Sequence, residues 1–253
     1  MKSVFTVIIT IVFLCIFSAC EGDKMTLKHY VMEYVLDVSD DSSNALVVED
    51  AFEEGMIRVM MRASVSNSIV SWKDTDDTKR SKYMSLARKN NDLGWDDKTL
   101  KYGETHLKAT WFRFTANQVI GITVTAESNW DEQTPKGSSL DDKFIFISTS
   151  PDQFLKNGYK LDRNQIEEAI KNANPKVQST LKFCASETLY TALPICDILS
   201  DIKFEDYQLM GVGQTWFALK SIDKLTKGAK INIQIKFGNG EIVNYKHICQ
   251  ENH

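Results

Sequence analysis

The residues best suited to chemistry lie on a long polar stretch, 127–142, in the middle of the chain. Trp130 stands there directly before Asp131 and Glu132, and the stretch ends in Asp141-Asp142. An indole on a polar loop can stack on a sugar or anchor an interface. We therefore predict a ligand-binding site at Trp130, Asp131 and Glu132.

Two other tryptophans, Trp72 and Trp95, also stand beside polar segments and are further candidates for such contacts. Trp111 and Trp216 instead lie inside strand-like patterns, which predicts that both belong to the core.

Catalysis by the same carboxylates is a weaker hypothesis. A glycosidase holds two carboxylates roughly 5–10 Å apart around a sugar, whereas acidic pairs on a polar loop are usually just solvated. Calcium suits oxygen-rich loops, but Asp74, Asp76 and Asp77 lack the spacing of a calcium-binding loop. We predict no metal site and no cofactor.

Signatures of established enzyme classes are missing from the sequence. It contains no Gly-x-Ser-x-Gly elbow, no His-Glu-x-x-His, no phosphate-cradling glycine loop and no dinucleotide fingerprint. A Cys-His nucleophile would have to be assembled in space from Cys184 or Cys196. None of the histidines forms an i, i+4 pair for a metal: His29, His106, His247 and His253. The sequence therefore favours a non-catalytic protein.

The first twenty residues predict where the chain acts. Lys2 precedes an uncharged apolar run from Val4 to Phe17, and small residues then lead to a polar sequence. This order is typical of a secretory signal peptide, and the run is too short to cross a bilayer comfortably as a permanent helix. Ser18-Ala19-Cys20 resembles the lipobox of bacterial lipoproteins, with Phe17 where leucine is usual.

The resemblance implies that the chain is cut before Cys20 and that this cysteine carries the lipid. Several acyl chains give stable membrane anchoring. In that class an aspartate after the cysteine holds the protein at the inner membrane; Glu21 stands here, so the outer membrane is expected, with a periplasmic or surface-exposed chain. The alternative is that Cys20 merely follows an ordinary signal cleavage site.

Composition limits the class of partner. The chain is 43% hydrophobic and 25% charged, as in ordinary globular proteins, and its net charge of −4 gives no reason to expect nucleic acid as a partner. After Cys20, three cysteines remain. Cys184 and Cys196 are the shortest disulfide closure; a bridge from Cys249 to either, or three buried thiols, are open alternatives.

Alternating apolar residues predict at least seven strands. The segments are Ile57–Val65, Phe112–Ala116, Ile120–Ala126, Phe144–Ile147, Ile202–Phe204, Thr215–Leu219 and Ile231–Phe237. Phe144–Ile147 is apolar on both faces, as a central strand would be. The turn at 238–240 predicts a hairpin with a three-residue loop and a left-handed glycine, because this register pairs Ile235 with Val243.

Two helices are predicted. Thr78–Lys89 has acidic residues before it and basic residues at its end. The second has Asp162 as its N-cap with Gln165 three residues later, and ends at Asn174-Pro175. The segment before them, 21–53, mixes signals: Val31, Tyr34 and Val35 fit a helical face, while 46–48 looks extended.

Together these elements predict an antiparallel, immunoglobulin-like β-sandwich with one or two short helical insertions. We expect a signal peptide at 1–19, a lipid anchor, tether and early element at 20–53, and the sandwich at 54–253. The predicted function is a lipid-anchored envelope protein that binds a glycan or a protein partner. The alternatives are an exported hydrolase acting on glycans and a structural subunit of an envelope or adhesive assembly.

Overall fold

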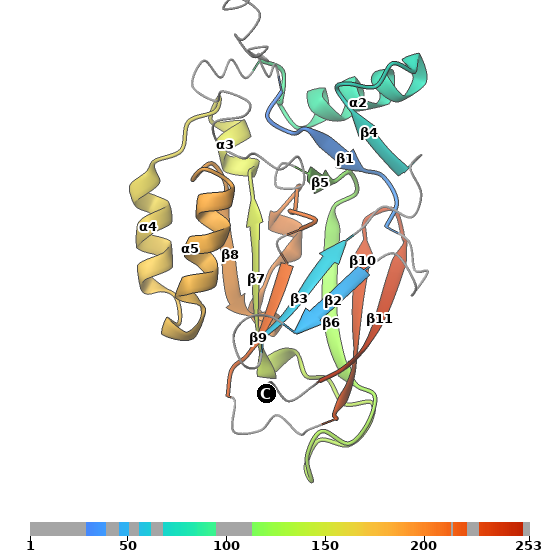
Figure 1. Ribbon diagram of the computed structural model, residues 1–253, viewed down its shortest axis with the longest axis vertical. Helices are drawn as coiled ribbons and strands as arrows, with labels where there is room; N and C mark the ends of the chain where they lie inside the picture. The colour runs from blue at the N-terminus through green and yellow to red at the C-terminus, as the bar shows by residue number, and fades with distance from the viewer. Residues whose placement is uncertain are drawn as a thin grey trace, which may run out of the picture.

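The computed structural model describes residues 29–38, 46–50, 56–61, 68–94, 113–213, 215–221 and 228–249. The predicted signal peptide, Cys20, Trp95 and Trp111 lie outside these residues. The described chain is mainly β, with few helices and three sheets whose strands are antiparallel except for one pair (Figure 1). Within the described ranges, no helix is long and apolar enough to cross a membrane.

The largest sheet has five strands in the order β2-β3-β9-β7-β8, all antiparallel. Their bounds are β2 Leu46–Asp50, β3 Met56–Met61, β9 Thr215–Leu219, β7 Phe144–Ser150 and β8 Leu193–Ile198. Every residue of β7 is buried, and β7 has a partner strand on each side. The prediction of a central strand here is confirmed.

The second sheet has three antiparallel strands in the order β11-β10-β6: β6 Val119–Ala126, β10 Lys230–Phe237 and β11 Ile242–Ile248. Ile235 pairs with Val243 and Ile233 with Tyr245, so the predicted three-residue hairpin is confirmed. Gly240 takes the left-handed conformation in this turn, with φ 90°. Only this register places the apolar side chains of both strands on one face.

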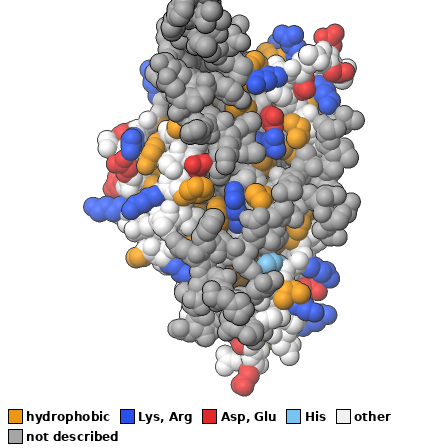
Figure 2. Space-filling model, viewed as in Figure 1, with side chains coloured by type: hydrophobic (Ala, Val, Ile, Leu, Met, Phe, Trp, Pro, Cys, Tyr) orange, Lys and Arg blue, Asp and Glu red, His pale blue; other side chains and the backbone are white. Residues whose placement is uncertain are grey.

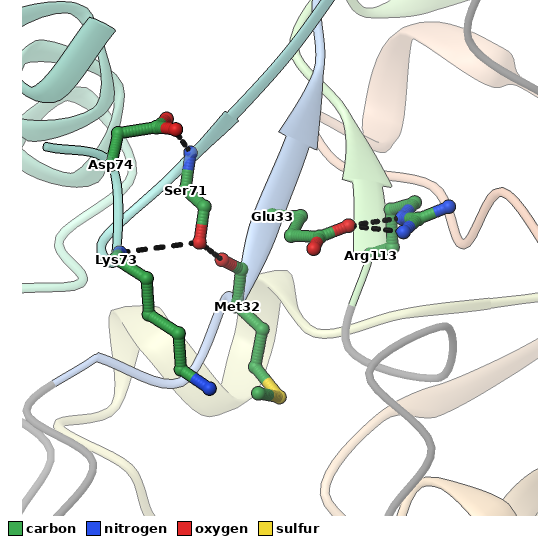
Figure 3. Close-up of polar contacts among 6 residues, drawn as sticks. All are labelled: Met32, Glu33, Ser71, Lys73, Asp74 and Arg113. Carbon is green, nitrogen blue, oxygen red and sulfur yellow. Dashed lines mark hydrogen bonds and ion pairs between the residues drawn. The ribbon is translucent and has the colours of Figure 1, made fainter. Parts of the chain in front are cut away.

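The third sheet is small and has the order β4-β1-β5, with β1 Glu33–Val35, β4 Ile69–Ser71 and β5 Arg113–Thr115. β1 pairs antiparallel with β4 and parallel with β5, so the helical face predicted around Tyr34 is wrong. Figure 3 shows the polar contacts that fasten β1: Glu33 forms an ion pair with Arg113, and Ser71 Oγ donates to the Met32 carbonyl at 3.2 Å.

The helices are α2 Asp77–Lys89, α3 Asp152–Lys156, α4 Arg163–Asn172 and α5 Gln178–Glu187. Both predicted helices are present. Asp162 caps α4, although its carboxylate accepts from Asn164 N–H at 2.9 Å rather than from Gln165. The strand predicted at Ile202–Phe204 is wrong, because Phe204 begins a 3₁₀ turn, Phe204–Asp206. A spacing of only two apolar residues does not distinguish such a turn from a strand.

The side chains of β7 divide the molecule into layers. Phe144 and Phe146 point into a core shared with the β11-β10-β6 sheet. Ile145 and Ile147 point into a core shared with α4 and α5. Successive side chains of a strand alternate between the faces of its sheet. The five-stranded sheet is therefore covered by the β11-β10-β6 sheet on one face and by α4 and α5 on the other (Figure 1).

A further core forms around β1. Tyr30, Tyr34, Tyr83 of α2 and Phe114 of β5 are fully buried there, together with Phe154 of α3 at 5% exposure. The described parts of the early segment thus belong to the folded body, because β1 is central to its sheet and β2 pairs with β3.

Removing the ring of Phe146 tests the importance of the central layer. Phe146 is fully buried and its ring lies 5.3 Å from that of Phe204 and 5.5 Å from that of Phe217. We expect Phe146→Ala to lower the free energy of unfolding by about 3–5 kcal/mol in urea titrations. The matched variant Phe183→Ala, at a ring on α5 that is 41% exposed, should cost below about 1 kcal/mol. Equal losses in the two variants would contradict this layering.

Candidate functional site

The structure places the predicted site at Trp130 inside the protein. Trp130 is 1% exposed and its ring meets Phe144 edge-on, with 6.1 Å between ring centroids. A sugar cannot stack on a buried indole, so the predicted ligand-binding role of Trp130 is not supported. The polar residues around it gave no signal that the ring folds inward.

Two of the neighbouring carboxylates, Asp131 and Asp141, accept hydrogen bonds from backbone N–H groups. Asp131 Oδ1 accepts the Gln133 N–H at 2.9 Å, and hydrogen bonding with Thr134 lowers the pKa of Asp131. Asp141 accepts the Val124 N–H at 2.6 Å. Glu132 is exposed beside them. Asp131 closes a local turn, and Asp141 joins the 3₁₀ turn Asp141–Lys143 to β6, so both carboxylates have a structural role.

The disulfide considered between Cys184 and Cys196 is not formed; these two cysteines and Cys249 are free thiols, as in the alternative of three unpaired cysteines. Both side chains contribute to the core beneath α5, Cys184 fully buried and Cys196 partly buried. Burial raises the pKa of Cys184 to about 12 and that of Cys196 to about 11. Since the thiolate is the reactive form, neither suits a Cys-His nucleophile. Cys249 lies buried in the core on the opposite face of the five-stranded sheet.

A different site is formed where α3, α4 and α5 come together. An open groove of about 800 Å³ lies between the C-terminal ends of α3 and α5 and the N-terminus of α4. Half-buried side chains form its floor: Tyr159, Leu161, Leu189, Tyr190 and Thr191. Exposed polar side chains form its rim: Asn157, Lys160, Asp162, Arg163 and Gln165. An apolar floor with a few polar groups around it is the usual composition of a ligand site.

Unusual backbone conformations concentrate at this groove. Four non-glycine residues among those described have positive φ, and three of them line the groove: Tyr159 at 63°, Leu189 at 53° and Tyr190 at 57°. The fourth, Asn91 at 59°, precedes a residue that contacts Tyr159. A left-handed conformation costs about 1–2 kcal/mol per non-glycine residue. Such strain gathers at functional sites more often than elsewhere.

At each of the two helix ends, a C-terminal cap accounts for the first left-handed residue. At the end of α3, the Tyr159 N–H donates to the Phe154 carbonyl at 2.7 Å, and at the end of α5 the Tyr190 N–H donates to the Ala185 carbonyl at the same distance. Both are the long-range bond of a Schellman cap, which needs a left-handed residue just before the donor. Gly158 supplies it in α3, whereas Leu189 takes that position in α5.

The rim of the groove carries positive charge close to an aromatic ring. The Arg163 guanidinium lies 4.0 Å from the centroid of the Tyr190 ring and pairs with Glu167 at 2.7 Å. The Arg163 side chain is 64% exposed, so this ion pair contributes little to stability. Figure 2 shows basic and acidic side chains next to each other over α4, at the left of the view. The groove therefore offers hydrogen-bond donors on a surface of mixed charge.

A buried carboxylate supports the groove from beneath. Asp92 is fully buried and accepts the N–H groups of Tyr30 at 2.8 Å and Val31 at 2.9 Å. The Tyr159 hydroxyl also donates to it, at 3.1 Å. On the other side, the hydroxyls of Tyr30 and Thr191 are hydrogen-bonded at 2.8 Å. Groove residues at both helix ends are thus connected to the segment that leads into β1.

Burial determines the ionisation of this cluster. It raises the pKa of Tyr159 to about 12, and it raises the pKa values of Tyr30, Tyr34 and Tyr83 further. It also raises the pKa of Asp92, although the hydrogen bonds from Tyr30 and Val31 oppose this. The four tyrosines are therefore neutral at physiological pH; Tyr159 lines the groove, whereas Tyr30, Tyr34 and Tyr83 are buried inside the protein.

The described lining of the groove does not form a hydrolytic centre. Among these described residues the one carboxylate, Asp162, caps α4, while glycoside hydrolysis uses two. Across the described ranges, no group of three His, Cys, Asp or Glu side chains is placed to hold a metal ion. What the arrangement can do is hold a ligand between aromatic and polar side chains.

Sequence reasoning missed this groove. Gly158 was a usable signal for the helix end before Tyr159, but the left-handed pair at Leu189 and Tyr190 contains no glycine. Trp72, the remaining described surface candidate, packs partly buried against the core around β1.

Comparisons of this chain with protein-family models, with curated proteins and with solved structures find no match.

Replacing Asp92 by Asn tests the support beneath the groove. A carboxyl accepts with both oxygens, whereas an amide nitrogen facing a backbone N–H cannot accept. We expect Asp92→Asn to lower the free energy of unfolding by about 1–3 kcal/mol near pH 4 in urea titrations. Because the folded-state pKa is raised, the stability that Asp92 contributes is complete below its unfolded pKa of about 3.9 and is lost as pH rises through the folded value. The difference in the free energy of unfolding between wild type and Asp92→Asn should therefore become smaller toward neutral pH.

The control is Asp141→Asn, because Asp141 accepts one backbone N–H that an amide oxygen can also accept. This variant should retain nearly wild-type stability. If the difference in the free energy of unfolding between wild type and Asp92→Asn increases as pH rises, the pKa of Asp92 is not raised in the folded protein.

Proposed function

We propose that this protein is a non-catalytic binding module and that the groove between α3, α4 and α5 binds a glycan. The observation that carries the proposal is the set of left-handed residues Tyr159, Leu189 and Tyr190 along one groove. Strain of this kind persists only where the surrounding structure holds it in place. Here it turns two tyrosines into the floor of the groove.

The composition of the groove favours a sugar over a large protein surface. Tyrosine rings suit the apolar faces of a sugar, and Asn157, Gln165 and Arg163 at the rim suit its hydroxyls. The volume of about 800 Å³ fits a ligand of a few sugar rings rather than a protein interface. Asp162 is the single carboxylate among the described residues of the lining, which favours binding over hydrolysis.

The location of the protein is part of the same proposal. Ser18-Ala19-Cys20 resembles a lipobox, so we propose lipid anchoring at Cys20 and a place in the cell envelope, at the outer membrane. The paired sheets around one core are compatible with an immunoglobulin-like arrangement, which we retain as a proposal about the fold. A scaffold of packed sheets that presents its binding residues at loops and helix ends fits this role.

Ligand binding is tested by thermal melting of the purified protein against a panel of oligosaccharides. A ligand at a hundredfold its dissociation constant should stabilise the protein by about 2.7 kcal/mol. Tyr190→Ala removes a ring from the floor and should weaken binding by about tenfold or more in calorimetric titrations. A shift that persists unchanged in this variant, or the absence of a shift with every sugar, would reject the proposal.

Two basic residues on α4 provide a matched pair of controls. Arg163 lines the groove, whereas Lys171 lies at the other end of the same helix and is exposed. We expect Arg163→Gln to weaken binding several-fold, because it loses the guanidinium donors at the rim. Lys171→Gln changes the net charge equally and should leave affinity unchanged. Equal effects would indicate nonspecific electrostatic attraction.

A further inference from the structure

Among the described strands, β11 is the edge strand of its sheet. β11 pairs with β10 on one side, and no other described strand pairs with it (Figure 1). Its two ends carry Ile242 and Ile248, which are 44% and 52% exposed. They are among five large hydrophobic side chains exposed in the described chain. A seven-residue edge with apolar ends is a template for pairing with another strand.

The hydrogen-bonding pattern shows which backbone groups face outward. The Phe237 N–H donates to the Glu241 carbonyl, and the Cys249 N–H donates to the Ala229 carbonyl, both at 2.9 Å. In an antiparallel pair, bonded residues alternate with residues whose backbone groups face away from the partner. The odd-numbered residues of β11 therefore bond to β10. Outward-facing N–H and C=O groups belong to Ile242, Asn244, Lys246 and Ile248.

The edge is complementary to itself. If a second copy of β11 runs antiparallel about a two-fold axis at Tyr245, Ile242 pairs with Ile248 of the second copy and Asn244 pairs with its Lys246. Every outward-facing N–H and C=O then meets a partner, because each pair consists of outward-facing residues. The exposed isoleucines cover each other, and each lysine faces an asparagine rather than another lysine.

The edge strand β8 of the five-stranded sheet lacks these properties. β8 contains Pro194, which has no N–H to offer a further strand. Helices α4 and α5 also pack against β8. Proline and covering helices are devices by which proteins protect sheet edges. β11 carries one lysine, Lys246, whose ammonium already pairs with Glu127 at 3.2 Å.

We propose that two copies of this protein associate through β11, pairing antiparallel about a two-fold axis at Tyr245. The β11-β10-β6 sheets of the two copies then join into one six-stranded sheet. This isologous contact closes after two copies, so it gives a dimer rather than a filament. The inference is independent of the ligand groove.

Position 244 allows a test by charge, because Asn244→Lys and Asn244→Glu both replace the amide that contacts Asn232 and Gln234 and differ in the sign of the charge they introduce. Asn244 is exposed. In the proposed register Asn244 of each copy faces Lys246 of the other, so the dimer contains two such pairs. Asn244→Lys opposes like charges, and Asn244→Glu opposes unlike charges. At about 0.5 kcal/mol per cross-strand pair, the two pairs should change the dimer dissociation constant by about fivefold in opposite directions.

The experiment is sedimentation equilibrium of the full chain in a non-ionic detergent at low salt, up to about 1 mM protein because edge contacts of this size are weak. We expect a monomer–dimer equilibrium that Asn244→Lys weakens and Asn244→Glu strengthens. Both effects should shrink at high salt. Thermal melting confirms that the variants fold. A monomer at every concentration, or dimers that respond equally to both substitutions, would overturn the proposal.

Discussion

Burial of the segment before β1 is the constraint on which this architecture depends most. The N–H groups of Tyr30 and Val31 lie inside the protein ahead of the strand ladder, and buried donors need acceptors. Asp92, which follows the C-terminal end of α2, supplies both carboxylate oxygens as acceptors. The same carboxylate accepts from Tyr159, so the contact that fixes the entry to β1 also supports the floor of the groove.

The chain uses the same solution a second time. Asp152, 7% exposed, accepts the N–H groups of Gln208 at 2.5 Å and Leu209 at 3.2 Å. It joins the start of α3 to the segment that leads toward β9. Burial raises the pKa of Asp152, as it does for Asp92. Each carboxylate replaces part of a strand ladder where the backbone leaves regular structure, and these hydrogen bonds account for its burial.

What the sequence could predict depended on alternation. The hairpin of β10 and β11 buries one face only, so its pattern of period two determined both strands and their register. β1 was not predicted as a strand because nearly all residues from Tyr30 to Val35 are buried, so apolar and polar residues do not alternate there. Trp130 was predicted to lie at the surface because its neighbours in the sequence are polar. These neighbours form turns, while the Trp130 ring packs inward against Phe144. The groove depends on helix ends that meet only in the folded protein.

The proposed groove and the proposed pairing edge lie at different places on this framework. Figure 1 shows α4 and α5 on one side of the five-stranded sheet and β11 at the opposite side of the molecule. Pairing through β11 would therefore leave both grooves uncovered and place them far from the two-fold axis. Two grooves on one dimer bind a repeating ligand with higher avidity than either alone, provided that the spacing allows both to engage. A glycan is such a repeating ligand, so weak single-site binding and weak dimerisation would reinforce each other at a surface.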